Sequence, residues 1–474
     1  MSVSTGATRS LPTRPSTGSR PASGSTWTRT RRRRVPRRPW AGAPDLAATL
    51  VGLGMGAVIA LAILSTSVGA LRAPGGWATA LGQLFGLVGT YLLLVMLLLI
   101  ARIPAVERVV GQDRLVRWHR RLGAWPICLL VAHAVLVTVG YAQSARTGSL
   151  HQFGIFLRSY PDVLAATVGL ALIVLAGVLS FRAARRRMRY ETWWVVHLYT
   201  YLAIALSFAH QLANGQSFVG HPLSRLLWAA VWVATAGVVL WFRVLVPVAR
   251  SLFHGLRVVE VRDEAPGVVS IVLAGRHLER LAVSGGQFFQ WRFLTRELWW
   301  QAHPYSLSAL PQPPYLRVTV KALGDHGQML HRIRIGTRVA VEGPYGAFTR
   351  HALRGRRALL VAAGVGVTPL RALLEDLPAH VSTDVVVRAS SSGELLFRTE
   401  IDRLVAKRGG RVHELVGSRR QFPTDAVLLH SIVPDFFDRD LYICGPEGFT
   451  EQLVSSVRQF GFPEERIHYE SFAF

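Results

Sequence analysis

The sequence predicts a multidomain membrane protein: a six-helix transmembrane bundle, then an antiparallel β-barrel, then an α/β Rossmann-like domain. Three observations lead to this fold class. Six apolar stretches long enough to cross a bilayer fill the first half, short β-branched runs follow, and a glycine turn between a strand and a helix comes last. The chain has 474 residues, 50% of them hydrophobic, which is enough for several domains.

The predicted spans contain few charged residues and alternate with two kinds of loop. They cover about 45–71, 78–101, 118–142, 161–181, 192–212 and 224–248. Arginines crowd the N-terminal tail and the second and fourth loops, whereas the intervening loops carry only Arg72, Arg146 and Arg158. Positive residues mark the cytoplasmic side. We therefore expect a multi-pass protein of the cell membrane, with both termini and the second half of the chain on the cytoplasmic side. The arginines that set this topology explain the net charge of +26 without a nucleic-acid partner.

Composition also suggests the domain limits. Residues 1–44 are rich in Ser, Thr, Pro, Gly and Arg and contain no apolar run, so we expect a disordered basic cytoplasmic tail and not a cleavable signal peptide. The predicted domains are a transmembrane domain at 45–250, a β-barrel at 255–352 and an α/β domain at 356–474. The two cysteines, Cys128 and Cys444, predict neither a disulfide framework nor a metal cluster.

Four histidines lie in predicted spans, His119 and His133 in the third, His197 and His210 in the fifth. An ionisable side chain in hydrocarbon usually has a partner or a function, and imidazole is a good axial ligand for haem iron. Within each span the histidines lie roughly 20 Å apart at about 1.5 Å per residue, which suits one haem near each face of an about 30 Å core. Both spans run in the same direction, so we predict the pairs His119–His197 and His133–His210. The alternative is four buried histidines hydrogen-bonded to neighbouring helices.

The fifth span requires a distortion to form these pairs. At about 100° per residue, the step from His119 to His133 returns to nearly the same helix face, whereas the step from His197 to His210 does not. We therefore expect a distorted helix or help from a neighbouring one. Arg120 and Arg121, beside His119, could pair with haem propionates or only set the topology.

The second half begins with strands and continues with a nucleotide-type turn. Runs starting at Val258, Val268, Phe288, Leu316 and Val339 alternate like barrel strands. A further strand from Ala358 then leads into Gly364-Val-Gly366-Val-Thr368-Pro369, and we expect a helix over 370–377. Backbone N–H groups at such a strand, turn and helix start can hold a pyrophosphate.

Five motifs in order closely resemble the ferredoxin-reductase superfamily of flavoproteins. They are His303-Pro304-Tyr305-Ser306-Leu-Ser308, Gly343-Pro-Tyr-Gly346, Gly364-Val-Gly366-Val-Thr368-Pro369, Cys444-Gly445-Pro446 and Glu470-Ser-Phe-Ala-Phe474. The histidine pairs resemble the transmembrane domain of ferric reductases and NADPH oxidases. Together the matches cover nearly everything from about residue 80 to the last residue. The resemblance implies FAD, two b-type haems and NADPH or NADH as cofactors.

The resemblance also implies a set of FAD-binding residues. These are His303, Pro304, Tyr305, Ser306, Lys321, Gly327, Gly343 and Phe474. Tyr305 would lie against the flavin ring system, Ser306 near its N5 atom, and Phe474 would shield the ring. The chain departs from its relatives at Gly327, where a Thr or Ser hydroxyl is usual.

The implied nucleotide site lies further along the chain. Its residues are Gly364, Gly366, Thr368, Pro369, Arg388, Ser390, Arg419, Cys444, Gly445 and Pro446. Cys444 would lie near nicotinamide C4, on the hydride path. Arg388, Ser390 and Arg419 fall where relatives hold an adenosine 2′-phosphate, which favours NADPH over NADH. We expect catalytic roles for Tyr305, Ser306, Cys444 and Phe474.

By resemblance, the chain is an NAD(P)H-dependent transmembrane oxidoreductase. Electrons would pass from cytoplasmic NAD(P)H through FAD and two haems to an external one-electron acceptor. We expect ferric iron or a ferric chelate as this acceptor. The alternative acceptor is oxygen, which would make the chain a superoxide-generating NADPH oxidase. A haem-bearing anchor or electron-accepting subunit for a partner protein is the alternative of another class, but complete flavin and nicotinamide motifs argue against it. Expected partners are NAD(P)H, the acceptor and membrane lipid, with neither nucleic acid nor an obligate protein partner.

Overall fold

The computed structural model describes residues 43–472 apart from 111, 182–187, 189, 323, 419 and 424. Six helices in this part of the chain are long and apolar enough to cross a membrane: Asp45–Leu64, Gly76–Ile100, Arg114–Ala145, Val163–Ser180, Thr192–Asn214 and Pro222–His254. The number and order of the predicted spans are thereby confirmed. Almost all of the predicted tail, together with Arg419 and Phe474, lies outside the described residues.

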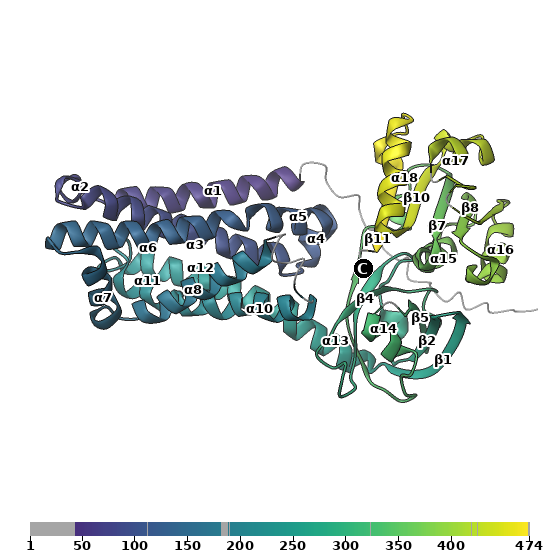
Figure 1. The fold of residues 1–474 in the computed structure, drawn as a ribbon, viewed down its shortest axis with the longest axis horizontal. Coiled ribbons are helices and arrows are strands. Elements are labelled where there is room, and N and C mark those ends of the chain that lie inside the picture. Colours follow the sequence, from purple (N-terminus) through teal and green to yellow (C-terminus); the bar gives the residue numbers. More distant parts are fainter. Residues whose placement is uncertain are drawn as a thin grey trace, which may run out of the picture. The chain divides into compact units, whose positions relative to one another are not determined.

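The membrane bundle consists of six long helices with shorter ones at their ends (Figure 1). The long helices are α1 (Ala43–Leu64), α3 (Gly76–Ile100), α6 (Ala124–Ala145), α8 (Val163–Ser180), α10 (Tyr190–Leu206) and α12 (Pro222–Leu240); the short ones are α2 (Val68–Arg72), α4 (Pro104–Val110), α5 (Gln112–Leu122), α7 (Ser149–Ser159) and α11 (Phe208–Asn214). Large apolar side chains such as Leu53 and Leu226 are exposed, as lipid-facing residues are. Helices α3 and α6 approach closely, since a Cβ on Gly82 would lie 2.8 Å from Val137 Cγ2.

Both histidine-bearing spans are interrupted. In the fifth, α10 ends at Leu206 and α11 begins at Phe208, and the amide of Ser207 donates to the carbonyls of Ala203 and Ile204 at 3.2 and 3.1 Å. The distortion expected between His197 and His210 is therefore present. The third span also breaks, between α5 and α6 at Gly123, which the sequence did not lead us to expect. Pro126 lacks the N–H that would bond the Leu122 carbonyl, which accounts for the break.

The region after the bundle is a small antiparallel barrel that follows helix α13 (Val246–His254). Its strands are β1 (Arg257–Ala265), β2 (Val268–Ala274), β3 (Phe288–Phe293), β4 (His303–Ser306), β5 (Tyr315–Lys321) and β6 (Val339–Tyr345), with helix α14 (Gly324–Leu330) after β5. They form two three-stranded sheets, ordered β1-β2-β5 and β4-β3-β6, and bridges Arg257↔Arg338 and Leu307↔Val318 join the sheet edges. Alternate β3 residues, Phe289, Trp291 and Phe293, fill the core.

The last domain is a parallel sheet between helices, as predicted. Its order is β11 (Ile467–Phe472), β10 (Asp440–Pro446), β7 (Arg357–Ala363), β8 (Ser382–Ala389), β9 (Val412–Val416). The helices are α15 (Val367–Asp376), α16 (Arg398–Ala406), α17 (Ala426–Ile432) and α18 (Glu447–Gln459). Strand β7 is buried from Ala358 to Ala363, as expected for a sheet covered on both faces.

The helix expected over 370–377 begins three residues earlier, at Val367, and ends at Asp376. Pro369 had suggested a later start. In the first turn, however, the missing N–H of proline has no partner inside the helix to lose, so Pro369 fits there. Thr368 and Pro369 therefore belong to the buried first turn and not to a loop.

Candidate functional site

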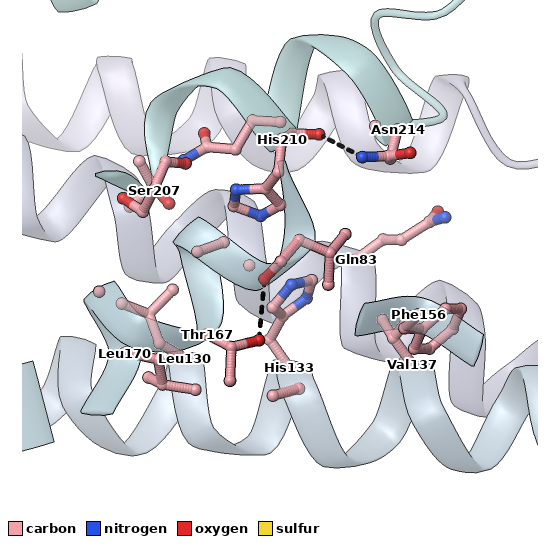
Figure 2. A pocket seen from close by; sticks show the side chains of 18 of the residues that line it. Gln83, Leu130, His133, Val137, Phe156, Thr167, Leu170, Ser207, His210 and Asn214 are labelled. Atoms are coloured by element: carbon pink, nitrogen blue, oxygen red, sulfur yellow. Dashed lines mark hydrogen bonds between the residues drawn. The ribbon is translucent and has the colours of Figure 1, made fainter. Parts of the chain in front are cut away.

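A cavity inside the bundle contains one predicted histidine pair. Figure 2 shows the imidazoles of His133, from α6, and His210, from α11, projecting toward each other in it. Its empty volume is about 1340 Å³, open space at its mouth included, and its wall contains apolar side chains such as Leu130 and Leu170. Sites for small ligands and cofactors are mostly apolar with a few placed polar groups. The apolar lining and the two facing imidazoles therefore fit a bis-histidine haem.

The other predicted pair is also brought together. The ring centroids of His119 and His197 lie 6.2 Å apart, and the two rings are nearly perpendicular. Imidazole nitrogens bind metals at about 2.0–2.1 Å, so two imidazoles on opposite sides of one metal have centroids roughly 6 Å apart. Trp193 stacks on His197, with centroids 5.2 Å apart. The spacing of this pair fits one metal centre between the rings.

Backbone carbonyls orient two of the four imidazoles. His119 Nδ1 lies 3.3 Å from the Met96 carbonyl oxygen, and His133 Nδ1 lies 2.8 Å from that of Gly82. A carbonyl only accepts, so Nδ1 donates in both cases and Nε2 keeps its lone pair for a metal. His210 Nδ1 is buried without a well-formed hydrogen bond in the described part of the chain, although the Ser207 backbone lies nearby.

Several neighbours of the histidines escaped the sequence analysis. A Cβ on Gly86 would lie 2.7 Å from His133 Nδ1, so this glycine makes room for the imidazole. Ser180 accepts a hydrogen bond from Trp193 Nε1 at 3.1 Å and lies 3.5 Å from His197 Nδ1. The recurrence of Gly82, Gly86 and Gly89 at helical spacing is the one sequence signal that could have indicated the close α3–α6 contact.

The predicted flavin motif forms strand β4. Ser306 is 3% exposed, and its Oγ has no hydrogen-bond partner within the described residues. The Tyr305 backbone carbonyl accepts a hydrogen bond from Trp291 Nε1 at 2.7 Å. The Tyr305 ring lies nearly parallel to the His303 ring, with centroids 6.3 Å apart. Burial raises the pKa of the Tyr305 phenol well above its usual range. A buried hydroxyl without a partner beside an aromatic ring fits a flavin edge with a hydrogen-bonding atom.

The structure gives a physical reason for Gly327 in place of the usual Thr or Ser. A Cβ there would lie 2.9 Å from Ala322 Cα and 3.0 Å from the Lys321 carbonyl oxygen. Helix α14 packs too closely on the end of β5 for a side chain at this position. Gly343, with φ of +142°, lies in β6 beside Phe289, and Pro304 pairs with Gln290.

The predicted nucleotide motifs meet at one edge of the parallel sheet. Chain order reverses between β7 and β10, and ligands of such sheets bind at this switch point, beyond the carboxyl ends of the strands. Gly364 follows β7 with φ of +54°, and a Cβ there would have no atom within 4 Å. A Cβ on Gly366 would lie 2.2 Å from the Cys444 carbonyl oxygen. Open space at Gly364 beside the start of α15 fits a pyrophosphate.

Cys444 and its neighbours stand on the other side of the same switch point. Cys444 is fully buried, and burial followed by the charge of Glu470 raises the pKa of its thiol well above the usual range. A Cβ on Gly445 would lie 2.8 Å from Phe449 Cδ1. Pro446 is the last residue of β10. A buried thiol with a raised pKa lacks the thiolate character of a reactive cysteine.

Two of the three residues predicted to hold a 2′-phosphate are described. Arg388 pairs with Ala363 in the sheet register, so it lies next to the glycine turn, and Ser390 directly follows β8. The Ser390 amide donates to Glu394 Oε2 at 3.2 Å. Sequence reasoning missed this carboxylate, which carries the charge opposite to that expected at a phosphate site.

Two families match the chain. Residues 85–208 match the ferric reductase like transmembrane component, and residues 267–349 match a FAD-binding domain. These matches confirm the predicted fusion of a ferric-reductase-type transmembrane component with a ferredoxin-reductase-type FAD module. The first match contains three of the four span histidines, and His210 lies two residues beyond its end.

Individual relatives resemble part of the chain. The ferredoxin reductase component of 3-ketosteroid-9-alpha-monooxygenase from Mycolicibacterium smegmatis is 32% identical over 226 residues, 45% of this chain and 63% of that protein. A Vibrio cholerae flavohemoprotein is 30% identical over 182 residues, 35% of this chain and 45% of that protein. The chain spans about half the length of the curated relatives it matches. Among solved structures, the FAD/NAD-binding domain of nitric oxide dioxygenase from Vibrio cholerae covers 46% of this chain and 98% of its own, with 25% identity and a TM-score of 0.37.

Proposed function

We propose that this chain, a ferric-reductase-type transmembrane component joined to a FAD-binding reductase module, transfers electrons from cytoplasmic NAD(P)H across the cell membrane to an external one-electron acceptor. The pairing of four span histidines into two facing sets, at two levels of one bundle, is the observation that supports this most directly. The proposed haem ligands are His119 with His197 and His133 with His210. The proposed domains are the basic tail at 1–44, the transmembrane di-haem domain at 45–250, the FAD-binding barrel at 255–352 and the NAD(P)-binding domain at 356–474.

The cofactors would supply the electron chemistry: FAD can accept two electrons as a hydride and release them singly, and haem can carry one electron at a time. The chain supplies position and environment. The glycine turn after β7 and the start of α15 would hold the pyrophosphate of the nucleotide. Cys444 and Thr368 would bound the nicotinamide pocket, while Tyr305 and Ser306 would hold the flavin.

Replacing Ser306 with alanine is expected to slow flavin reduction by NADPH on the order of tenfold, the value of one hydrogen bond of about 1.4 kcal/mol. Its hydroxyl is buried and has no partner in the described protein, so the flavin is the group left to receive it. Stopped-flow bleaching of the flavin measures the rate. Ser308→Ala is the matched control, because Ser308 Oγ is bonded to the Arg317 carbonyl and Thr319. Equal rates in Ser306→Ala and the wild type would contradict the assignment.

The test of the relay is an anaerobic visible spectrum of the detergent-purified chain with FAD. Addition of NADPH should bring up the bands of reduced b-type haem, with about two haems per chain. Haem that dithionite reduces but neither nucleotide reduces would overturn the relay and favour a partner-fed membrane subunit. Parallel titration with NADH decides the nucleotide: Arg388 and Ser390 favour NADPH, whereas Glu394 would repel a 2′-phosphate and hydrogen-bond a ribose hydroxyl instead.

Ferric iron or a ferric chelate is the acceptor we propose, and oxygen is the second candidate. One observation favours oxygen: no described residue lining the cavity of His133 and His210 is charged, and its polar groups are neutral, such as Gln83, Tyr141 and Asn214. A small uncharged molecule enters such a cavity without losing hydration of a charge. Superoxide formation should be compared with ferrous iron formation by the NADPH-reduced protein. The faster product identifies the acceptor.

A further inference from the structure

We propose that a cluster of five side chains is a positioning unit, which holds the flavin-carrying strands at a fixed separation from His119 and His197. The cluster consists of Arg102, Glu107, Arg243, Glu342 and Tyr345. This inference rests on the proposed electron relay and assigns a role to residues that the relay itself does not use.

The five side chains form an unbroken sequence of polar contacts. Arg102 Nη1 lies 3.3 Å from Glu107 Oε1, and the Arg102 guanidinium lies 4.0 Å from the centre of the Tyr345 ring. The Tyr345 hydroxyl donates to Glu342 Oε1 at 2.7 Å, and Arg243 Nη1 donates to the same oxygen at 2.7 Å. Loss of the Glu342 carboxylate therefore removes a partner from both the Tyr345 hydroxyl and the Arg243 guanidinium.

Burial distinguishes this cluster from ordinary surface ion pairs. The side chains of Arg102 and Glu107 are 13% and 14% exposed and that of Glu342 is 20% exposed, whereas both members of the Arg262–Glu260 pair are about half exposed. Burial raises the pKa of Glu107 and of the Tyr345 phenol. Exposed pairs contribute little, but breaking a buried, hydrogen-bonded pair is strongly unfavourable. Such contacts fix a geometry instead of merely adding charge to a surface.

At one end the cluster leads to α3, whose Met96 carbonyl contacts His119, and to α10, which carries His197; we call His119 and His197 the inner pair. Arg102 follows α3, on which the Met96 carbonyl orients His119. Arg243 lies in the π-helical turn Trp241–Leu245 and interacts with Tyr201, one turn after His197 on α10. A π-helical turn is rare and often marks a functional position, here by turning an arginine out of the helix repeat.

At the other end the cluster reaches the strands of the flavin site. Tyr345 and Ser306 are both register partners of Phe288, one on each side of β3. They are therefore two strands apart, roughly 10 Å, at the same level of one sheet. Ser251 of α13 also binds β6, the strand of Tyr345. Its hydroxyl donates to the Val341 carbonyl at 3.2 Å and accepts from the Val341 amide at 3.0 Å. A shift of β6 would move Ser306 with it.

The rate of electron transfer between two carriers falls as their separation grows, so contacts that fix this separation also fix the rate. Apolar contacts tolerate sliding, whereas directional hydrogen bonds to buried charges do not. The cluster joins the sheet of Ser306 to α3, which contacts His119, and to α10, which carries His197. We infer that it sets the gap across which electrons reach the inner pair.

The test uses the full-length protein with its cofactors. Glu342→Gln and Arg243→Gln should each slow haem reduction by NADPH about tenfold, while NADPH reduction of the flavin, followed with ferricyanide, keeps the wild-type rate. Hydrogen exchange of the amides in 104–110 and 339–345 should become faster. Arg243→Lys should retain most of the haem reduction rate, because a single arginine nitrogen contacts Glu342. Arg262→Gln, which removes an exposed pair on β1, should change neither readout.

Three results would overturn the proposal: haem reduction at the wild-type rate in both glutamine variants, a parallel loss of flavin reduction, or unchanged hydrogen exchange in the two segments. A parallel loss would mean that the cluster supports the flavin site itself. Failure of the relay is recognised separately, because wild-type protein with reduced flavin would then leave its haem oxidised. The exchange measurement tests the cluster even in that case.

Discussion

Replacing His133 or His210 with alanine is expected to lower the haem content from about two to about one per chain, while NADPH continues to reduce the flavin. Both imidazoles enter one cavity, and both would be needed to hold a haem there, so loss of either should weaken its binding. His133 is moreover held by the Gly82 carbonyl, and no other described histidine lines the cavity. Haem extraction and quantification, with flavin bleaching in the same sample, measure both effects.

His151→Ala and His221→Ala are the matched controls for this prediction. Both histidines are exposed and lie outside the described cavity, in segments predicted to be external. These variants should keep the full haem content and the full rate of electron transfer to the acceptor. A full haem complement in His133→Ala and His210→Ala would show that the ligand assignment is wrong.

The histidine pairs could be predicted because they depend on two properties that a sequence displays directly. The direction of a span follows from counting spans, and the depth of a residue follows from its position within one. The break at Ser207 could be expected because thirteen residues do not complete whole helical turns, so His197 and His210 could not share a face. The position of the break could not be predicted, because it depends on which backbone carbonyls accept the hydrogen bond of the Ser207 amide.

Other parts of the site depend on contacts between distant segments and left no pattern in the sequence. Trp193 stacks on His197 from within the same helix, yet tryptophan is common at membrane surfaces and carries no signature of this role. Arg102 and Tyr345 meet only because α3 and β6 are brought together by the fold. Arg102 was one of many arginines that topology alone explained. Because arginine is abundant in this sequence, the few arginines that have a specific partner cannot be recognised from the sequence alone.

The two glycines of the turn after β7 provide the second large effect, because they are expected to fail in different ways. Gly366→Ala should destabilise the α/β domain by about 1–3 kcal/mol, the usual effect of an extra methyl group in a packed site. Its Cβ would lie 2.2 Å from the Cys444 carbonyl oxygen and 2.7 Å from Gly445 Cα, and both are backbone atoms that cannot turn aside. Thermal unfolding followed by release of flavin fluorescence measures the loss.

Gly364→Ala, in contrast, should leave the fold nearly intact. It should lower the rate at which NADPH reduces the flavin by at least about tenfold. Its Cβ meets no protein atom within 4 Å, so the only internal penalty is the φ of +54°, about 1–2 kcal/mol for a residue with a side chain. The new methyl group would occupy the open space in which we place the pyrophosphate. A normal rate of flavin reduction in Gly364→Ala, with normal nucleotide affinity, would show that the nucleotide does not bind at this turn. Two glycines with one residue between them thus show two uses of a small residue: Gly366 allows close packing of β7 against β10, and Gly364 leaves room for a ligand.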